Sequence, residues 1–170
     1  MDDDLRLNGE RVVLVPVAAG HVPELRRILH TPEVWRRWGD EDTTPGWPFD
    51  DPETVRFAVL VDGSVAGMIQ YGEEDEPAYR HASVDIFLDP AVHGRGLGRD
   101  AVRTIAHHLV RDRGHHRLTI DPAADNAAAI RCYAAVGFRP VGVMRRYERD
   151  ADGGGWHDGL LMDLHADELR

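Results

Sequence analysis

The first part of the chain alternates short apolar runs with one helical pattern. Residues 11–15 form a β-branched run that predicts a strand, and apolar residues recur at helical spacing over 22–29, where Pro23 suits a first helical turn. Residues 31–52 hold three of the four tryptophans and have no sustained period. We therefore expect a strand, a helix and then a loop-rich segment with one short helix.

A hairpin and a third strand are predicted next. Two apolar runs, 56–61 and 65–71, flank Asp62-Gly63, a dipeptide that tolerates the positive φ angles of a tight turn. After a polar loop, residues 82–88 alternate between two faces of a strand. One face carries Val84, Ile86 and Leu88, and the other carries Asp85 and Phe87.

The period becomes helical in the second half. An apolar stripe over 98–110 predicts a helix that ends at Gly114. Residues 117–121 predict another strand, and Asp125 or Asn126 can cap the helix that follows. This second helix is expected to run to residue 135.

Gly137 stands where the C-terminal cap of that helix belongs. Residues 138–147 and 160–164 alternate well enough to form a final strand pair, joined through 152–155. No repeat or low-complexity linker interrupts this order, so we expect a single domain over 1–170. The predicted class is a mixed α/β (α+β) fold.

Composition excludes several other classes. A chain of 170 residues with 42% hydrophobic and 29% charged residues is typical of one globular domain. No apolar stretch approaches the ~20 residues of a membrane helix, and no apolar segment follows the acidic residues 1–4. The single cysteine, Cys132, cannot form an internal disulfide. We therefore expect a cytoplasmic protein that does not bind a membrane.

The net charge of −10 indicates which partners are favoured. All 20 basic residues are arginine, which excludes a lysine nucleophile or Schiff base. An acidic surface repels nucleic acid and attracts a small cationic substrate. The absence of lysine can equally be a compositional habit of the source genome.

A glycine-rich turn separates the third strand from the helix after it. Residues 93–98 read His-Gly-Arg-Gly-Leu-Gly, and the glycines allow backbone N–H groups to point at an anion beside a helix N-terminus. The turn lacks the lysine of a P-loop and the spacing of a dinucleotide fingerprint. By itself it indicates either an anion site or a structural connection.

A second motif, after the predicted strand 117–121, indicates more specifically what the glycine turn does. Asn126, Ala129, Tyr133, Gly137 and Phe138 follow the pattern N-x-x-A-x-x-x-Y-x-x-x-G-F, and seven residues return Asn126 and Tyr133 to one helical face. Together with the glycine turn, this pattern strongly resembles the GNAT superfamily of acetyl-CoA-dependent N-acetyltransferases. The resemblance implies the GNAT fold, with a central mixed, mostly antiparallel, twisted sheet flanked by helices.

The resemblance also implies a site for acetyl-CoA. The glycine turn would cradle the pyrophosphate, with His93 where the family usually has Gln or Arg, and the end of the third strand would pair with the pantetheine arm. Tyr133 would protonate the departing thiolate, since a phenol of pKa ~10 is a protonated donor at neutral pH. Without the motif, Tyr133 would be a core aromatic. The implied cofactor-binding residues are Phe87, Leu88, His93, Gly94, Arg95, Gly96, Leu97, Gly98, Arg99, Asn126 and Ala129.

Residues 85–88 and 119–138 are similar to the aminoglycoside 6'-N-acetyltransferases. This implies that Asp85 is the base for the attacking amine and that Asp121 binds the acceptor. The chemistry is reasonable because an acceptor that arrives as an ammonium must lose a proton before its nitrogen attacks. Alternatively, Asp85 points to solvent and Asp121 shapes the turn before Pro122.

Trp38, Glu74 and Asp75 lie where such enzymes place acceptor loops, although a tryptophan cluster is often a packed lid. The chain has ten histidines but no zinc-binding spacing, and His107 and His108 point about 100° apart on a helix, so we expect no metal. The expected activity is therefore acetyl transfer from acetyl-CoA to the 6'-amine of an aminoglycoside.

Other acceptors remain open at this point. Residues 155–162 resemble the ending of ribosomal-protein N-terminal acetyltransferases, which would make the acceptor a protein α-amine. A siderophore-type hydroxylysine acceptor is a further option. A non-catalytic acetyl-CoA sensor would normally lose the tyrosine or the glycine turn, and both are present. Related enzymes are commonly dimers, so a homodimer is an option.

Overall fold

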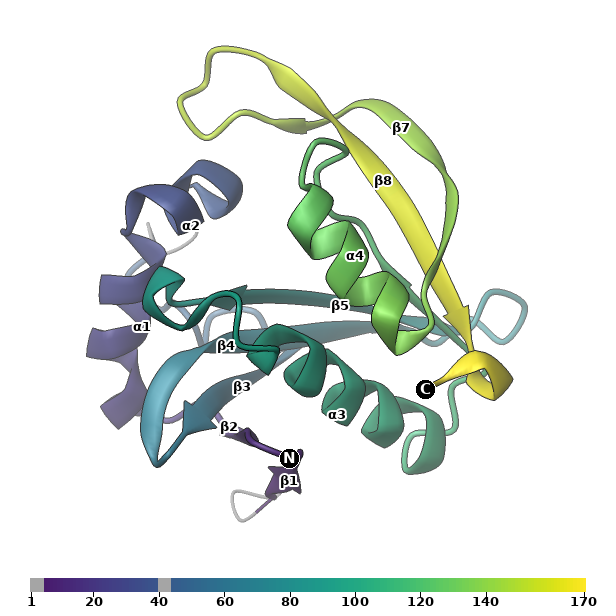
Figure 1. Cartoon of the computed structure of the whole chain (residues 1–170), viewed down its shortest axis with the longest axis horizontal. Helices are drawn as coiled ribbons and strands as arrows, with labels where there is room; N and C mark the ends of the chain where they lie inside the picture. The colour runs from purple at the N-terminus through teal and green to yellow at the C-terminus, as the bar shows by residue number, and fades with distance from the viewer. Residues whose placement is uncertain (1–4, 40–43) are drawn as a thin grey trace.

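One twisted sheet organises the part of the chain that the computed structural model describes, residues 5–39 and 44–170 (Figure 1). Residues 1–4, which bear on the expected lack of a signal segment, and residues 40–43 lie outside the described residues. Within the described part the sheet has eight strands in the order β1-β2-β3-β4-β5-β6-β8-β7. The strands are β1 (Leu7–Asn8), β2 (Val13–Pro16), β3 (Thr54–Val61), β4 (Ser64–Glu74), β5 (His81–Leu88), β6 (Arg117–Ile120), β7 (Arg139–Arg149) and β8 (Trp156–His165).

Neighbouring strands are antiparallel except β5 and β6, which run parallel. This confirms the predicted mixed, mostly antiparallel sheet. The predicted hairpin joins β3 to β4, with positive φ angles of 50° at Asp62 and 79° at Gly63.

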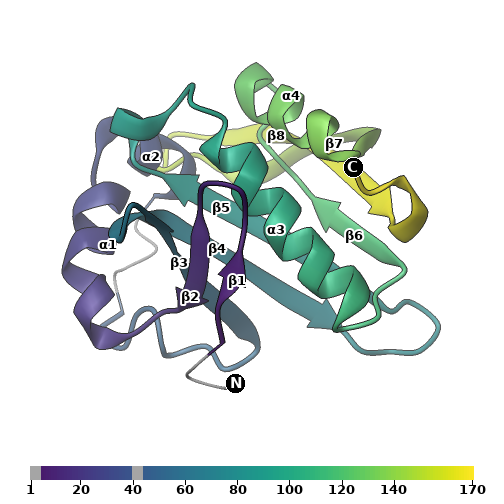
Figure 2. The same ribbon diagram turned by 60° about the horizontal axis from the view of Figure 1, so that its bottom comes forward.

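Helices cover both faces of the sheet (Figure 2). The long α3 and the shorter α4 pack over one face, where the larger core contains Ile105 and Tyr133. On the other face, α1 and α2 enclose a smaller core that contains Trp47 and Phe87. The helices are α1 (Val22–Leu29), α2 (Pro32–Trp38), α3 (Leu97–Arg111) and α4 (Ala127–Val136), with single 3₁₀ turns η1 (Ala19–His21), η2 (Pro90–Val92) and η3 (Ala166–Glu168). None of the helices in the described ranges is long and apolar enough to span a bilayer.

The structure differs from the sequence prediction mainly at the two ends of the sheet. The two-residue strand β1 was not expected, because a strand this short has no readable alternation. β8 begins four residues earlier than the predicted 160–164. The β7–β8 hairpin extends past the core (Figure 1), and residues 156–158 are not buried, so the start of β8 has no buried face to mark it as strand. The other strand of the hairpin, predicted at 138–147, is β7.

The candidate site lies where the parallel strands β5 and β6 separate. In the described part of the chain β5 pairs with β6 only at Ala82↔Leu118 and Ser83↔Thr119. Residues 84–88 therefore diverge from β6, and the gap lies next to α4. A parallel pair that separates in this way leaves strand backbone available to a ligand.

Candidate active site

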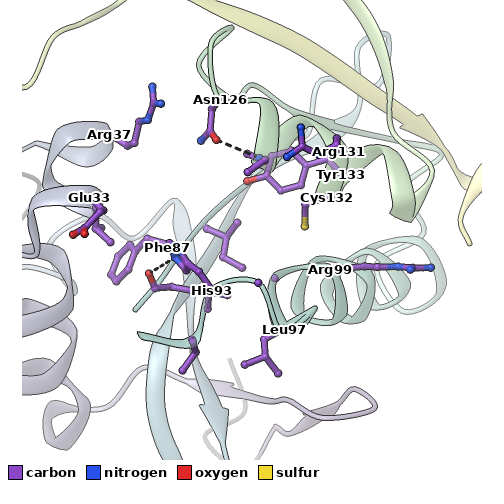
Figure 3. Close-up of a pocket in the computed structure, with 18 of the residues that line it drawn as sticks. Glu33, Arg37, Phe87, His93, Leu97, Arg99, Asn126, Arg131, Cys132 and Tyr133 are labelled. Atoms are coloured by element: carbon purple, nitrogen blue, oxygen red, sulfur yellow. Dashed lines mark hydrogen bonds between the residues drawn. The ribbon is translucent and has the colours of Figure 1, made fainter. Parts of the chain in front are cut away.

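A cavity of about 580 Å³ lies beside the diverging end of β5. Its walls come from α2, the end of β5, the turn at 92–99 and α4 with its N-cap. Glu33 and Arg37 of α2 face Asn126, the N-cap, and Tyr133 of α4 across the opening (Figure 3). We refer to this cavity as the cleft. Of the residues predicted from the sequence, it brings together Trp38, Phe87, Leu88, His93, Gly94, Gly96, Leu97, Gly98, Arg99, Asn126, Ala129 and Tyr133.

The glycine turn brings the N-terminus of α3 to the cleft. Gly94 and Gly96 have φ angles of 74° and 76°, a conformation that favours glycine, although a Cβ at either position would meet no atom within 4 Å. Backbone conformation and not space therefore requires these two glycines. Because α3 begins at Leu97, the positive end of its dipole lies at the cleft wall, where it favours an anion.

His93 is bound to the strand that precedes it. Its Nε2 lies 3.0 Å from the carbonyl oxygen of Leu88 (Figure 3). Because a carbonyl oxygen only accepts, Nε2 is the donor and carries the proton. The side chain therefore fastens the turn to the end of β5.

The structure does not bring Arg95 to this cleft. Arg95 lines a second cavity of about 450 Å³, together with Arg6 and Arg11, and its carbonyl oxygen accepts a hydrogen bond from Arg11 Nη1 at 2.6 Å. The two glycines that flank Arg95 both have positive φ angles, a conformation that the backbone of other residues rarely adopts. Arg99, one helical turn later, lines the cleft.

Three further arginines line the cleft that sequence reasoning did not identify. Arg36 and Arg37 come from α2, and Arg131 comes from α4 two residues before Tyr133. Arg37 Nη1 also forms an ion pair of 2.7 Å with Asp125 Oδ1, which joins α2 to the segment before α4. Arg131 could have been identified from its place within the Asn126–Tyr133 motif. The sequence of α2 carries no motif that would have indicated Arg36 or Arg37 as cleft residues.

The first turn of α4 is capped by a predicted site residue. Asn126 Oδ1 accepts a hydrogen bond from Ala129 N at 3.2 Å (Figure 3), so this side chain begins the helix as well as lining the cleft. The neighbouring Cys132 is an uncharged thiol, because burial raises its pKa to about 11 against the opposing charge of Arg99.

Tyr133 is a buried phenol with two carboxylates near it. Its side chain is 7% exposed, and burial raises its pKa far above the usual value. The carboxylates of Asp85 and Asp121 act in the same direction. Tyr133 is therefore a protonated donor at neutral pH, and both predicted acceptor-side carboxylates lie within electrostatic range of it.

Asp121 has a partner that sequence reasoning missed. The interaction with Asp121, together with burial, raises the pKa of Tyr147 on β7 to about 12. Asp85 is exposed, and its Oδ1 accepts from its neighbour Ile86 N at 2.9 Å. Tyr147 had no signal in the sequence, because an irregular stretch of β7 sets its direction.

The predicted acceptor residues divide into two groups. Trp38 packs edge-on against Phe87, with ring centroids 5.0 Å apart, and so forms part of the cleft wall. Glu74 and Asp75 are not brought to the cleft. Since β4 runs antiparallel to β5, Glu74 pairs with His81 at the start of β5, about 23 Å along the strand from Leu88.

Comparison with known proteins finds similar sequences among acetyltransferases. The chain is 35% identical over 116 residues to a mycothiol acetyltransferase of Rhodococcus erythropolis, covering 65% of this chain and 38% of that protein. It is 30% identical over 105 residues to an aminoglycoside N(6')-acetyltransferase type 1 of Klebsiella pneumoniae, covering 61% of this chain and 51% of that protein. The chain thus spans about half or less of the length of these two relatives.

Among solved structures, RimJ of Mycobacterium smegmatis in complex with CoA-disulfide superposes with a TM-score of 0.84 at 22% identity, covering 97% of this chain and 89% of that one. This match shows the same fold. The model of the acetyltransferase (GNAT) family matches residues 22–138, which is more than half of the chain. The chain therefore belongs to the acetyltransferase (GNAT) family.

Proposed function

We propose that this protein transfers the acetyl group of acetyl-CoA to a primary amine, and that the acceptor is an aminoglycoside acetylated at its 6'-amine. One observation carries the proposal. The buried, protonated phenol of Tyr133 lies at the cleft and within electrostatic range of two carboxylates, Asp85 and Asp121. Tyr133 lines the cleft, whereas the two carboxylates act on it from outside the cleft lining. Together they offer the proton donor and the proton or cation acceptors that amine acylation requires.

The charges of the cleft support acetyl-CoA as the acyl donor. Among the described residues, its wall carries four arginines, at 36, 37, 99 and 131, and one carboxylate, Glu33. With the N-terminus of α3 at the same wall, the cleft favours an anionic ligand such as the phosphates of coenzyme A. The diverging end of β5 offers backbone groups to an extended arm.

The residues then divide the chemistry between them. Bound acetyl-CoA supplies the activated thioester. Asp85 accepts a proton from the acceptor ammonium, directly or through a water molecule, and Asp121 holds the cation. Tyr133 donates its proton as the carbon–sulfur bond breaks, and its raised pKa keeps that proton in place until then.

An aminoglycoside acceptor is supported by charge and by the relatives. The protein has a net charge of −10, which attracts a polycationic substrate. The 30% identity to an aminoglycoside N(6')-acetyltransferase covers 61% of the chain. A protein α-amine is the second candidate, favoured by the likeness of residues 155–162 to the ending of N-terminal acetyltransferases and by the place of this segment in β8, beside Asp121.

The test is thiol release from acetyl-CoA with a panel of amines. The panel contains aminoglycosides with and without a 6'-amine, peptides with free N-termini and small polyamines. Turnover confined to aminoglycosides that have a 6'-amine supports the full proposal. Turnover on peptides alone keeps the reaction and replaces the acceptor, and silence on every amine contradicts the proposed activity.

A further inference from the structure

Three polar side chains form a row across neighbouring strands near the cleft. Arg56 on β3 pairs with Gln70 on β4, and Gln70 pairs with Asp85 on β5. Paired residues of antiparallel strands share one face of the sheet, with Cβ atoms about 5 Å apart. The row therefore brings Gln70 next to the carboxylate proposed as the base.

This row lies on the sheet face that carries part of the cleft wall. Phe87, two residues after Asp85, projects from the same face of β5, lines the cleft and packs against Trp38. Two residues of a strand span about 7 Å, which is the distance along β5 from Phe87 to the row. Asp85 is exposed and Gln70 is half-buried, so a ligand can reach both. An acceptor amine at Asp85 therefore lies beside Gln70.

Arg56 is held in place by the loop before β3. Its side chain is only 10% exposed, and Nη1 donates to the carbonyl oxygen of Pro48 at 2.9 Å. Nη2 lies 3.8 Å from Asp51 Oδ2. Because these contacts fix the planar guanidinium, the direction of its Nε–H is defined as well.

That N–H sets the orientation of the Gln70 amide. Arg56 Nε donates to Gln70 Oε1 at 3.0 Å. A guanidinium only donates, so the oxygen of the amide faces Arg56 and Nε2 points away from it. Acceptance by Oε1 also polarises the amide, which strengthens its N–H groups as donors. Within residues 5–39 and 44–170, no group accepts a hydrogen bond from Nε2.

We propose that Gln70 is a specificity-determining residue of the acceptor site, whose amide N–H donates to a hydroxyl oxygen of the acceptor close to the amine that is acetylated. This inference rests on the proposed function and deepens it. With the ammonium at Asp85, the amide on the neighbouring strand is within reach of an oxygen a few bonds from the nitrogen. Amino sugars carry such hydroxyls and simple polyamines carry none, so Gln70 favours amino sugars.

The first test compares two acceptors that differ only in hydroxyl groups, kanamycin B and its 3',4'-dideoxy derivative. Gln70→Met keeps the length of the side chain and removes its donors. We expect it to lower kcat/KM about fivefold for kanamycin B, the effect of one neutral hydrogen bond, and less than twofold for the derivative. Asn8→Ala, which removes an exposed amide on β1, should change neither value.

A residue that serves only to accept from Arg56 would affect every acceptor alike. An equal loss on both acceptors in Gln70→Met, or no loss on either, therefore overturns the inference. The proposed function survives that result as long as the wild-type protein acetylates aminoglycosides.

A second measurement uses the wild-type protein and does not depend on the folding of a variant. Gln70 is the only glutamine in the sequence, so ¹⁵N labelling of the glutamine side chain gives the NMR signals of a single NH₂ group. We expect saturating kanamycin B, added in the presence of coenzyme A, to shift these signals, and the dideoxy derivative to shift them much less. Signals that kanamycin B leaves in place overturn the inference, whatever the kinetics. A wild-type protein that acetylates no aminoglycoside overturns the proposed acceptor, and the role of Gln70 with it.

Discussion

At the scale of single residues, burial sets the protonation of the candidate groups. Tyr133 and Cys132 are adjacent on α4, and burial raises the pKa of both. Both side chains are therefore neutral at physiological pH, and Tyr133 is a proton donor and not a base. These two cleft-lining side chains of α4 thus present no negative charge to an anionic cosubstrate.

Tyr133→Phe tests this assignment with little change of shape. Removal of the phenolic proton should lower kcat about 100-fold, because general acid catalysis typically contributes 10²- to 10⁴-fold. The dissociation constant of acetyl-CoA, measured by calorimetry, should stay within about twofold. An unaltered kcat would remove Tyr133 as the acid, and a matching loss of cosubstrate affinity would make it a packing residue.

Arg95 and Arg99 should differ in their contribution to acetyl-CoA binding, although the sequence predicts that both bind it. Arg99 lines the cleft and Arg95 lines the second cavity. Arg99→Ala should therefore weaken acetyl-CoA binding about tenfold, the effect of one charged hydrogen bond, and Arg95→Ala should leave it nearly unchanged. Fluorescence or calorimetric titration with coenzyme A measures both, and a larger effect from Arg95→Ala would place the phosphates on the other side of the turn.

At the scale of elements, a buried carboxylate joins the N-terminal hairpin to α3. Asp100 is 5% exposed and accepts hydrogen bonds from the backbone N–H groups of Glu10, Arg11 and Val12 at 2.7 to 3.0 Å. Burial alone would raise the pKa of Asp100, but these three N–H groups outweigh it and lower the pKa below its usual value. The contact fixes β1 and β2 against the helix whose N-terminus faces the cleft.

Asp100→Ala should lower the free energy of unfolding by about 3 kcal/mol, because it leaves three N–H groups without their acceptor. Urea denaturation at pH 7 measures the change. Asp112→Ala removes an exposed carboxylate after the end of the same helix and should change stability by less than about 0.5 kcal/mol. Equal effects of the two substitutions would contradict a structural role for the buried contact.

The fit between β4 and β5 sets the shape of the cleft wall. A Cβ at Gly67 would lie 2.1 Å from the carbonyl oxygen of Phe87, whereas a Cβ at Gly72 would meet Ser83 Oγ at an ordinary 3.5 Å. Gly67→Ala should therefore displace the end of β5, lowering stability by about 1–3 kcal/mol and kcat/KM at least tenfold. Gly72→Ala, on the same strand, should leave kcat/KM within twofold, and a similar loss in both variants would contradict this explanation.

The elements were predictable where a buried face imposes a period, and less so where it does not. The alternation of residues 82–88 and the apolar stripe of α3 correspond to β5 and α3, since both pack on the larger core. The turn and the Asn126–Tyr133 motif marked the cleft because local sequence determines their geometry. The position of Glu74 depends on strand pairing over a long distance, and that of Tyr147 on a bulge, and neither has a local pattern.

At the scale of the whole molecule, the cleft and a charged cluster lie at opposite ends of the central strands. Glu73, near the end of β4, is bound by Arg113 Nη2 at 2.7 Å and by His115 Nε2 at 2.7 Å. His115 is 1% exposed, and Arg113 lies in the same connection between α3 and β6. This cluster joins the end of the sheet that is remote from the cleft to the segment after α3. It makes no contribution at the cleft end.

Low pH should therefore lower the free energy of unfolding, because protonation of Glu73 weakens its interactions with Arg113 and His115. The hydrogen bond from Arg113 lowers the pKa of Glu73 from its unfolded value of 4.5 to about 2. Burial acts in the opposite direction, and the hydrogen bond from His115 lowers the pKa further. A folded pKa below the unfolded one means that the contribution is complete above about pH 4.5 and is lost as the pH falls toward 2. Glu73→Gln should consequently lower the urea midpoint most at pH 6 and progressively less at pH 4 and pH 3. Glu74→Gln, an exposed neighbour, serves as the control, and a Glu73→Gln deficit that does not shrink with falling pH would show that packing and not charge accounts for the loss.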